Sequence, residues 1–342
     1  MVLPPDDFTM PGMRSDALGK REPVALLHPS AALAPGADPG DPFRHLAFFY
    51  GSDAEYVDGL AGFVRGALAR GHATFIAVPA ARAVPLREAL GSECEQVAFA
   101  DMTELGRNPS RIIAAVRAFT GRHPGRYVSY VGEPAWAGRS PPELVEAAKH
   151  EALLNLAFAG VPATIVCPYE PGLPAAVLAD ARRTHPLLAE GGVEFPSGDY
   201  LGADQVPASC QEELPEPPAV EVSLTYDRDL NPVRAAVGRQ AALAGLSPDR
   251  AADLTLAVSE LAANTLRYTA GHGSFRSWRT ADELVCEIRD QGWITDPLAG
   301  RLRPAASELG GQGLWVVNQV CDLVEMRTGP GQTVIRLHMS AR

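Results

Sequence analysis

The sequence predicts two domains of different fold class: an α/β domain with a parallel sheet over residues 44–197 and an α+β domain over residues 219–342. Three observations predict this. The length of 342 residues exceeds that of one ordinary domain. Short apolar strands alternate with helices after residue 43, and a proline-rich, acidic linker follows at 198–218. After the linker the elements come in a different order.

Repeated strand–helix units fill the first domain. Apolar runs predict strands, namely 45–50, 73–78, 96–100, 126–131 and 163–169. Amphipathic stretches predict helices, namely 54–71, 80–90, 109–120, 142–159 and 174–184. Strands that are apolar on both faces are typical of a parallel sheet covered by helices on both sides. The order of the strands in that sheet cannot be read from the sequence.

The second domain begins with an alternating strand at 219–225. Helices follow at 231–245 and 247–269, then a hairpin over 273–290, and a last strand at 332–339. Helices gathered beside a mostly antiparallel sheet are an α+β arrangement. Residues 1–43, rich in Pro, Gly and Ala and without the pattern of a signal peptide, predict a disordered tail.

Composition narrows the class of protein. The net charge of −11 argues against nucleic acid as a direct partner. No apolar run approaches the roughly 18 residues of a membrane span, so no membrane partner is expected. Five scattered cysteines without C-x-x-C spacing fit a reducing cytoplasm and speak against a zinc site or a disulfide framework. We therefore expect a cytoplasmic protein. The sequence leaves a homodimer open.

The helix containing "SELAANTLRYT" carries polar residues in step. Glu260, Asn264 and Arg267 fall on one stripe, while the apolar face lies roughly 100° further round. Leu254, Val258, Leu261 and Thr265 make up that apolar face. Taken alone, the pattern is that of an amphipathic surface helix.

Two further motifs change this interpretation. A strand ends in "RDQG", which places Asp290 and Gly292 at its end, and "ELGGQGLWVVNQVCD" puts glycines before a helix. Glycines at a helix start let backbone N–H groups approach phosphates. A carboxamide beside a carboxylate can hold Mg²⁺ and water, and an isolated carboxylate can accept a hydrogen bond from an exocyclic amine. Each motif alone could be a turn; together they predict a nucleotide site.

In order and spacing, residues from about 220 onward resemble the GHKL ATPases, which have a Bergerat-type ATP-binding sandwich. They are most similar to the anti-sigma regulatory factors, which are serine/threonine kinases. The matching residues come from three motifs: Glu260 and Asn264; Asp290 and Gly292; and Gly311, Gly313 and Leu314 of "GQGL".

The resemblance implies a role for each motif. Asn264 would coordinate Mg²⁺, Glu260 would act as the catalytic residue on the acceptor hydroxyl, and Asp290 would read the adenine amine of ATP. The other matching residues would bind ATP, and the loop between Trp293 and Gly310 would be a lid. The implied function is regulation of transcription: a signal-responsive phosphorylation of Ser or Thr on an anti-sigma factor antagonist of STAS type, with a sigma factor as a further partner.

Two departures leave an alternative open. Tyr268 stands where related ATPases often carry His, and Gln312 stands where a basic residue is frequent. The alternative is a non-catalytic switch in which ATP sets the conformation that binds a partner; a scaffold that binds no nucleotide is a third option. A histidine kinase is not supported, because no His occurs between His185 and His272 to act as phosphoacceptor.

The first domain resembles the MEDS sensory domain, which looks like a RecA/KaiC-type core that has lost its nucleotide loop. The resemblance is carried by "HLAFFY", "VGEPAW", "KHEALLN", "CPYE" and "THP". A Walker loop needs Gly-x-x-x-x-Gly-Lys after the first strand, whereas residues 51–55 read GSDAE. This domain is therefore expected to sense a ligand and not to hydrolyse ATP.

Five polar residues are candidate ligand contacts of the sensory domain, namely His45, Glu133, Glu151, Tyr169 and His185. Glu133 follows a strand end, where parallel sheets bind ligands. The alternative interpretation is structural: His45 and Tyr169 would be hydrogen-bonded strand ends, and His185 would cap a helix C-terminus.

Overall fold

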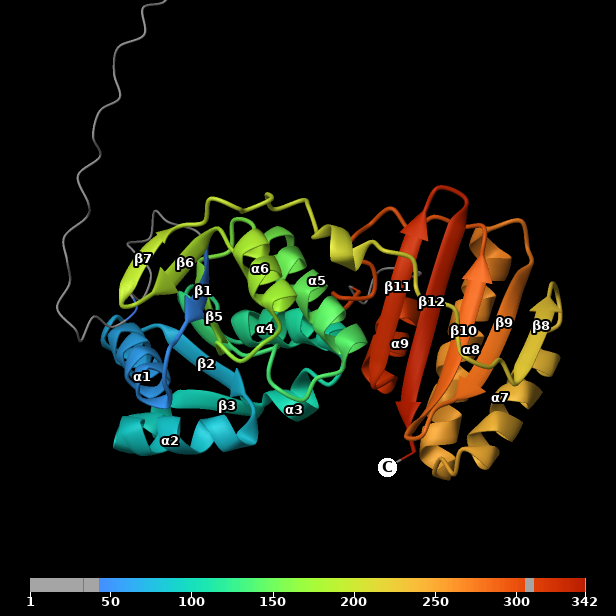
Figure 1. Ribbon diagram of the computed structural model, residues 1–342, viewed down its shortest axis with the longest axis horizontal. Coiled ribbons are helices and arrows are strands. Elements are labelled where there is room, and N and C mark those ends of the chain that lie inside the picture. The colour runs from blue at the N-terminus through green and yellow to red at the C-terminus, as the bar shows by residue number, and fades with distance from the viewer. Residues whose placement is uncertain (1–32, 34–42, 305–310, 342) are drawn as a thin grey trace, which may run out of the picture.

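The computed structural model describes Leu33, residues 43–304 and residues 311–341. Two sheets, one in each half of the chain, lie side by side with their helices (Figure 1). The tail predicted over residues 1–43 lies outside the described residues, except for Leu33 and Phe43.

The first half alternates strands and helices as predicted. Its strands are β1 (Phe43–Phe49), β2 (Ala73–Val78), β3 (Val97–Asp101), β4 (Val128–Gly132), β5 (Ala163–Tyr169), β6 (Leu187–Glu190) and β7 (Val193–Pro196). Its α-helices are α1 (Asp53–Ala69), α2 (Ala80–Leu90), α3 (Met102–Leu105), α4 (Ile112–Gly121), α5 (Pro141–Ala157) and α6 (Ala175–Thr184). Two 3₁₀ turns are η1 (Gly91–Gln96) and η2 (Pro109–Arg111).

These strands form one sheet in the order β3-β2-β4-β5-β1-β6-β7. All neighbours pair in parallel except β6 and β7, which form an antiparallel edge. The sequence analysis missed these two strands, because each has only four residues and Gly191 and Gly192 make a tight turn between them.

Helices cover both faces of this sheet, as the apolar strands predict. On one face α1 and α2 bury side chains such as Tyr56, Phe63 and Leu86. On the other face α4 and α5 bury side chains such as Ile112 and Leu154. His45, Glu151, Cys167 and His185, described below, lie on this second face between the sheet and α5.

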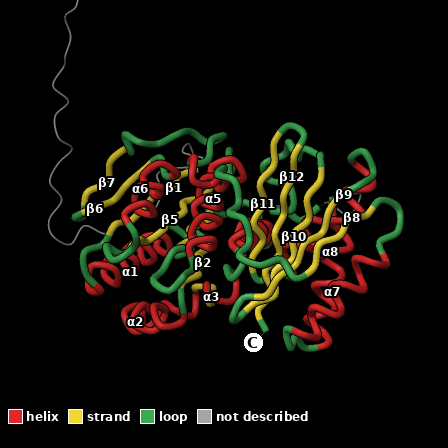
Figure 2. The backbone as a smooth tube through the Cα atoms, turned by 45° about the vertical axis from the view of Figure 1, so that its right-hand side comes forward, coloured by secondary structure: helices red, strands yellow, loops and turns green. Residues whose placement is uncertain are grey.

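The second half contains an antiparallel sheet with helices on one face (Figure 2). Its strands are β8 (Val222–Tyr226), β9 (Gly273–Arg279), β10 (Glu283–Asp290), β11 (Leu323–Gly329) and β12 (Gln332–Ser340), in the order β11-β12-β10-β9-β8. Its helices are α7 (Asn231–Leu243), α8 (Pro248–Tyr268) and α9 (Gln312–Val320). The sequence analysis did not predict β11.

The segment predicted as a linker packs across the second sheet, on the face opposite the helices. It contains the 3₁₀ turn η3 (Ala208–Cys210), and both Cys210 and Leu214 are buried. Arg327 of β11 donates to the Glu212 carbonyl at 2.9 Å, and Arg336 of β12 donates to the Pro215 carbonyl at 2.5 Å. The acidic linker is thus held by arginines of the sheet.

The two halves contact each other through buried polar groups. Glu146 of α5 is fully buried and pairs with Arg327 at 2.7 Å and with Arg301 at 3.4 Å. Asn108 donates to the Asn318 carbonyl of α9 at 3.0 Å, and Lys149 donates to the Met326 carbonyl at 2.8 Å. Since a buried charge is costly without its partner, these pairs fix the contact between the halves.

No helix in the described part of the chain combines the length and apolar character that crossing a bilayer requires.

Candidate functional sites

The second half holds a cavity of about 1300 Å³ between α8, the end of β10 and the start of α9. Every residue of the three predicted motifs lines it, namely Glu260, Asn264, Asp290, Gly292, Gly311, Gly313 and Leu314. Motifs more than fifty residues apart in sequence therefore meet at one place. Tyr268 and Gln312 line the same cavity.

Helix α8 presents Glu260 and Asn264 because its other face is fixed in the core. Ser247 caps its first turn by accepting from the Arg250 N–H at 3.3 Å. Leu254 and Leu261 are buried against the sheet, as the helical periodicity predicts. The stripe on which Glu260 and Asn264 lie is consequently turned into the cavity.

Asp290 is held in place by two donors. Its Oδ2 accepts from Thr265 Oγ1 at 2.6 Å, and its Oδ1 accepts from the Gly292 N–H at 2.8 Å. Tyr226 in turn donates to Thr265 Oγ1 at 3.0 Å. The carboxylate keeps lone pairs for an acceptor role toward a ligand, and its orientation is set before any ligand arrives.

The glycines allow α9 to begin close to α8. Gly311 has φ +77°, in the left-handed region that favours glycine, and it precedes the first turn of α9. At Gly313 a Cβ atom would lie 2.8 Å from Glu260 Oε2 and 3.3 Å from Asn264 Nδ2. The first turn of α9 therefore lies against the α8 side chains that line the cavity, and the N-terminus of a helix is where anions bind.

The sequence analysis missed two residues of this site. Thr265 was assigned to the apolar face of α8; it is buried, but its hydroxyl positions Asp290. Thr333 of β12 pairs with Asp290 across the sheet, lines the cavity, and donates to the Gly292 carbonyl at 3.1 Å. The sequence does not reveal such a role for threonine. Its methyl group fits an apolar pattern, and its hydroxyl can form a hydrogen bond in the site at the same time.

The segment after Gly292 forms one wall of the cavity. Leu298 and Leu302 line the cavity and also pack against the core of the first half. Arg301 between them is buried and pairs with Glu146. The lid was predicted between Trp293 and Gly310; its residues 305–310 lie outside the part of the chain that the structure describes.

In the first half, the turn after β1 is unsuited to phosphate. Ser52 caps α1, and Glu55 Oε2 accepts from the Gly51 N–H at 2.7 Å. The Glu55 carboxylate thus takes the Gly51 N–H, which in a phosphate-binding loop would be free to bind phosphate. This agrees with the acidic sequence GSDAE.

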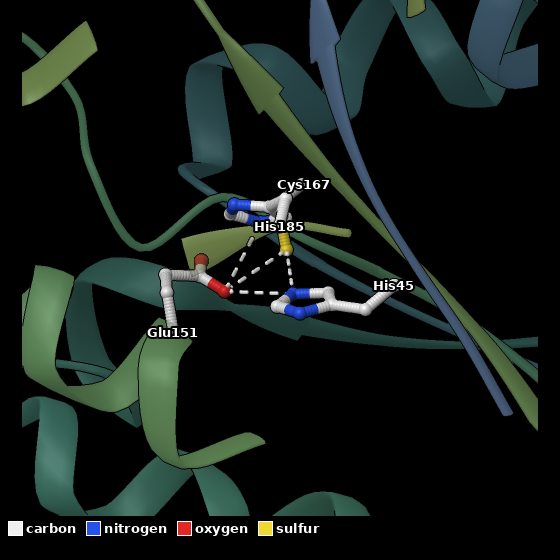
Figure 3. A group of neighbouring side chains, drawn as sticks. All are labelled: His45, Glu151, Cys167 and His185. Atoms are coloured by element: carbon white, nitrogen blue, oxygen red, sulfur yellow. Dashed lines mark hydrogen bonds and ion pairs between the residues drawn. The ribbon is translucent and has the colours of Figure 1, made fainter. Parts of the chain in front are cut away.

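Four buried side chains from separate elements converge between the first sheet and α5 (Figure 3). They are His45 of β1, Glu151 of α5, Cys167 of β5 and His185 after α6, and we call them the His45 cluster. One ligand-type atom from each lies within 4.8 Å of the others. Burial lowers the pKa of His45 to about 4, so its imidazole is neutral.

Further residues fix the two imidazoles. His45 Nδ1 lies 3.1 Å from Asn155 Oδ1, and Asn155 Nδ2 donates to the Thr184 carbonyl at 2.7 Å. His185 Nδ1 donates to the Ala181 carbonyl at 2.8 Å. Each Nδ1 faces an acceptor and so carries a proton, while each Nε2 is directed toward the Glu151 carboxylate.

The family comparisons agree with both halves. Residues 44–186 match the family model "MEDS: MEthanogen/methylotroph, DcmR Sensory domain", and residues 223–339 match "Histidine kinase-like ATPase domain". The chain is a MEDS domain followed by a histidine kinase-like ATPase domain. The large cavity belongs to the ATPase domain and the His45 cluster to the MEDS domain.

Two solved structures are distantly similar to the chain. The ATPase domain of G40P has 12% identity and a TM-score of 0.29, with 43% of this chain and 68% of that chain covered. The flagellar accessory protein FlaH from Methanocaldococcus jannaschii has 11% identity and a TM-score of 0.25, with 45% and 74% covered. Scores this low establish no common fold. Comparison with curated proteins returns no match.

The five candidate residues of the MEDS domain do not form one site. His45, Glu151 and His185 lie in the cluster, and the ring of Tyr169 meets that of His185 edge-on at 5.6 Å between centroids. Glu133 lies apart: it accepts from Tyr56 at 2.9 Å, and burial raises its pKa to about 7.

The structure confirms only some of the structural roles predicted for these residues, namely strand ends for His45 and Tyr169 and a helix C-cap for His185. Tyr169 ends β5 and His185 caps α6, but His45 lies inside β1. Cys167 was not a candidate, because the cysteine spacing argued against a metal site. Cysteine spacing identifies only metal sites whose ligands are close in sequence, whereas the four residues of this cluster come from four separate elements.

Proposed function

We propose that the ATPase domain binds Mg-ATP in the large cavity and transfers the γ-phosphoryl group to a serine or threonine of a partner protein. The observation that carries this is the convergence of Glu260, Asn264, Asp290 and the Gly311–Leu314 turn on one cavity. The resemblance to the anti-sigma regulatory factors, with their Bergerat-type fold, supplies the reaction class. The acceptor is then an anti-sigma factor antagonist of STAS type, and a sigma factor is a second partner.

The proposed roles follow from where the groups lie. The Asn264 carboxamide would hold Mg²⁺, which prefers few protein oxygens and several waters. Glu260, beside it on α8, would accept the proton of the acceptor hydroxyl. Asp290 would accept from the adenine amine, and the first N–H groups of α9 would face the phosphates. Asn264 and Glu260 both lie against Gly313, at the phosphate end of the cavity.

The cavity wall offers a route by which the MEDS domain would regulate this chemistry. Leu298 and Leu302 line the cavity and also pack against the core of the MEDS domain. Arg301 pairs with Glu146 on α5, the same helix that carries Glu151 of the His45 cluster. A ligand that shifts α5 would therefore move the wall. This supports a signal-responsive regulator.

The second candidate is an ATP-dependent binding switch without phosphotransfer. It is favoured by Gln312, which places a neutral side chain at the first helical position of α9, and by the exposed Tyr268. In this reading ATP changes the wall that packs on the MEDS domain, and the partner recognises the change. It predicts ATP binding and nucleotide-dependent partner affinity with no labelled product.

The deciding experiment incubates the full chain with γ-labelled Mg-ATP and candidate antagonist proteins. The kinase proposal expects label on the antagonist, a rate loss of about 10²–10⁴-fold in Glu260→Gln, and near-normal ATP affinity in that variant. Asn264→Ala should lose the Mg²⁺-dependent part of binding. Glu88→Gln on the exposed side of α2 is the matched control. ATP binding without label would select the switch; full transfer in Glu260→Gln would remove the assigned role.

A further inference from the structure

We propose that the His45 cluster is a metal site that binds one zinc ion. Its four members are 0–1% exposed and come from two strands, one helix and the end of another. Figure 3 shows their ligand-type atoms pointing toward a common centre. The proposal concerns the MEDS domain and does not depend on the function of the ATPase cavity.

The distances suit tetrahedral coordination. Zinc with metal–ligand bonds of about 2.0–2.3 Å holds its ligand atoms about 3.3–3.6 Å apart. Glu151 Oε2 lies 3.0 Å from His45 Nε2 and 3.4 Å from His185 Nε2. Cys167 Sγ lies 3.5 Å from His45 Nε2 and 3.4 Å from Glu151 Oε2. The two remaining pairs, from His185 to His45 and to Cys167, lie within 4.8 Å, so binding would draw His185 inward by up to about 1 Å.

The hydrogen bonds outside the cluster prepare both histidines as ligands. Metal-binding imidazoles commonly donate their other N–H to a carbonyl or carboxylate, which fixes the tautomer. Asn155 Oδ1 serves His45 in this way, and the Ala181 carbonyl serves His185. As a result, both Nε2 atoms face the Glu151 carboxylate, and a cation between them could bind all three groups.

The buried atoms point to the same conclusion. His185 Nε2 is buried without a hydrogen-bond partner among the described residues. No Lys or Arg in that part of the chain pairs with the buried Glu151 carboxylate, which faces the two imidazoles. Buried polar atoms normally have partners, so a buried nitrogen without one indicates a bound ion or water.

The charges balance when zinc binds. The Cys167 thiol gives up its proton to solvent, so the site contributes one thiolate, one carboxylate and two neutral imidazoles. These two negative charges neutralise Zn²⁺, which avoids the cost of a buried net charge. A donor set of two nitrogens, one sulfur and one oxygen favours zinc among the common divalent ions, since Mg²⁺ and Ca²⁺ require oxygen ligands.

The test uses the untagged full chain. Metal analysis of the purified protein should find one zinc ion per chain. After removal of zinc by a chelator, Co²⁺ should give a thiolate-to-cobalt charge-transfer band together with the intense d–d bands of a tetrahedral site. Titration with Zn²⁺ in weak buffer should release about one proton per ion.

Cys167→Ser should abolish the charge-transfer band. Cys94→Ser, a half-buried cysteine of the same domain outside the cluster, should keep it. His45→Asn should lower zinc affinity in a chain whose circular dichroism is unchanged. The wild-type cobalt spectrum tests the proposal even if both core variants fail to fold. Absence of bound zinc and of the cobalt bands in wild type would overturn it, as would a charge-transfer band that persists in Cys167→Ser; the cluster would then be a hydrogen-bonded His–Glu–His network.

Discussion

Asp290 should make the ATPase cavity selective for the exocyclic amine of adenine. The sharpest perturbation is a ligand that differs from ATP only there: purine riboside triphosphate, which has hydrogen in place of the amine. A hydrogen bond to a charged group contributes about 1.5–3 kcal/mol, and losing it leaves a carboxylate unpaired. We therefore expect wild type to bind ATP about 10- to 150-fold more tightly than the analogue.

Asp290→Asn should reduce this preference while preserving the fold. The asparagine carbonyl can accept from the Gly292 N–H, and Thr265 can turn its hydroxyl to the Leu261 carbonyl, 3.3 Å away. A neutral hydrogen bond contributes about 0.5–1.5 kcal/mol, so the ratio should fall to about 2- to 12-fold. Asp290→Ala should bring it close to unity, at a cost in stability because two donors lose their acceptor.

The assay is calorimetric titration of the full chain with each nucleotide and Mg²⁺. Asp296→Asn is the matched control, because Asp296 also lines the cavity but caps the Leu298 N–H at 2.9 Å. Its selectivity ratio should equal that of wild type. A wild-type chain that binds both nucleotides equally, or an Asp290→Asn ratio equal to that of wild type, would refute the assignment of Asp290 to adenine.

Three further predictions concern the free energy of unfolding and the affinity for ATP. Burial opposes the charge on His338, but hydrogen bonds to Glu283 and Glu325 outweigh it and raise its pKa to about 9. The charged His338 then contributes up to about 3 kcal/mol to the free energy of unfolding; this contribution is fully present below about pH 6.5 and is lost as pH rises through 9. In urea unfolding, His338→Gln should flatten the pH dependence of that free energy between these values. An unchanged pH dependence in the variant would contradict this assignment. Glu146→Ala leaves Arg301 and Arg327 without their buried carboxylate and should cost about 3–5 kcal/mol in urea unfolding, whereas the exposed Glu88→Ala should cost almost nothing. Thr265→Val keeps the packing of α8 but removes one donor to Asp290, so ATP affinity should fall by about 5- to 10-fold, ~1 kcal/mol; wild-type affinity would show that Thr265 only fills space.

Much of the fold follows from local sequence patterns. Nearly continuous apolar strands separated by amphipathic helices predict a parallel sheet covered on both faces, and the structure contains it. The short strands β6 and β7 were missed because four residues leave too little pattern to distinguish a strand from a loop. The antiparallel edge they form is a tertiary feature, fixed by pairing with β1.

The two sites differ in what the sequence could reveal. In the ATPase domain, the helical stripe of Glu260 and Asn264 and the glycines before α9 are local signals, so the sequence predicted residues that the structure gathers in one cavity. The His45 cluster depends on strand order. His45 and Cys167 meet because β1 pairs with β5, with Ala47 opposite Cys167. Strand order cannot be read from the chain, so Cys167 counted only as one of five scattered cysteines.

The most direct test of the central proposal is calorimetric titration of the full chain with Mg-ATP, repeated with Asp290→Ala. Binding in the large cavity predicts a saturable heat with one nucleotide per chain in wild type and an affinity about 10- to 150-fold lower in the variant. No saturable heat at millimolar ATP in wild type would mean that the glycines and Asp290 only form turns. Equal binding by wild type and Asp290→Ala would mean that the nucleotide site does not include Asp290.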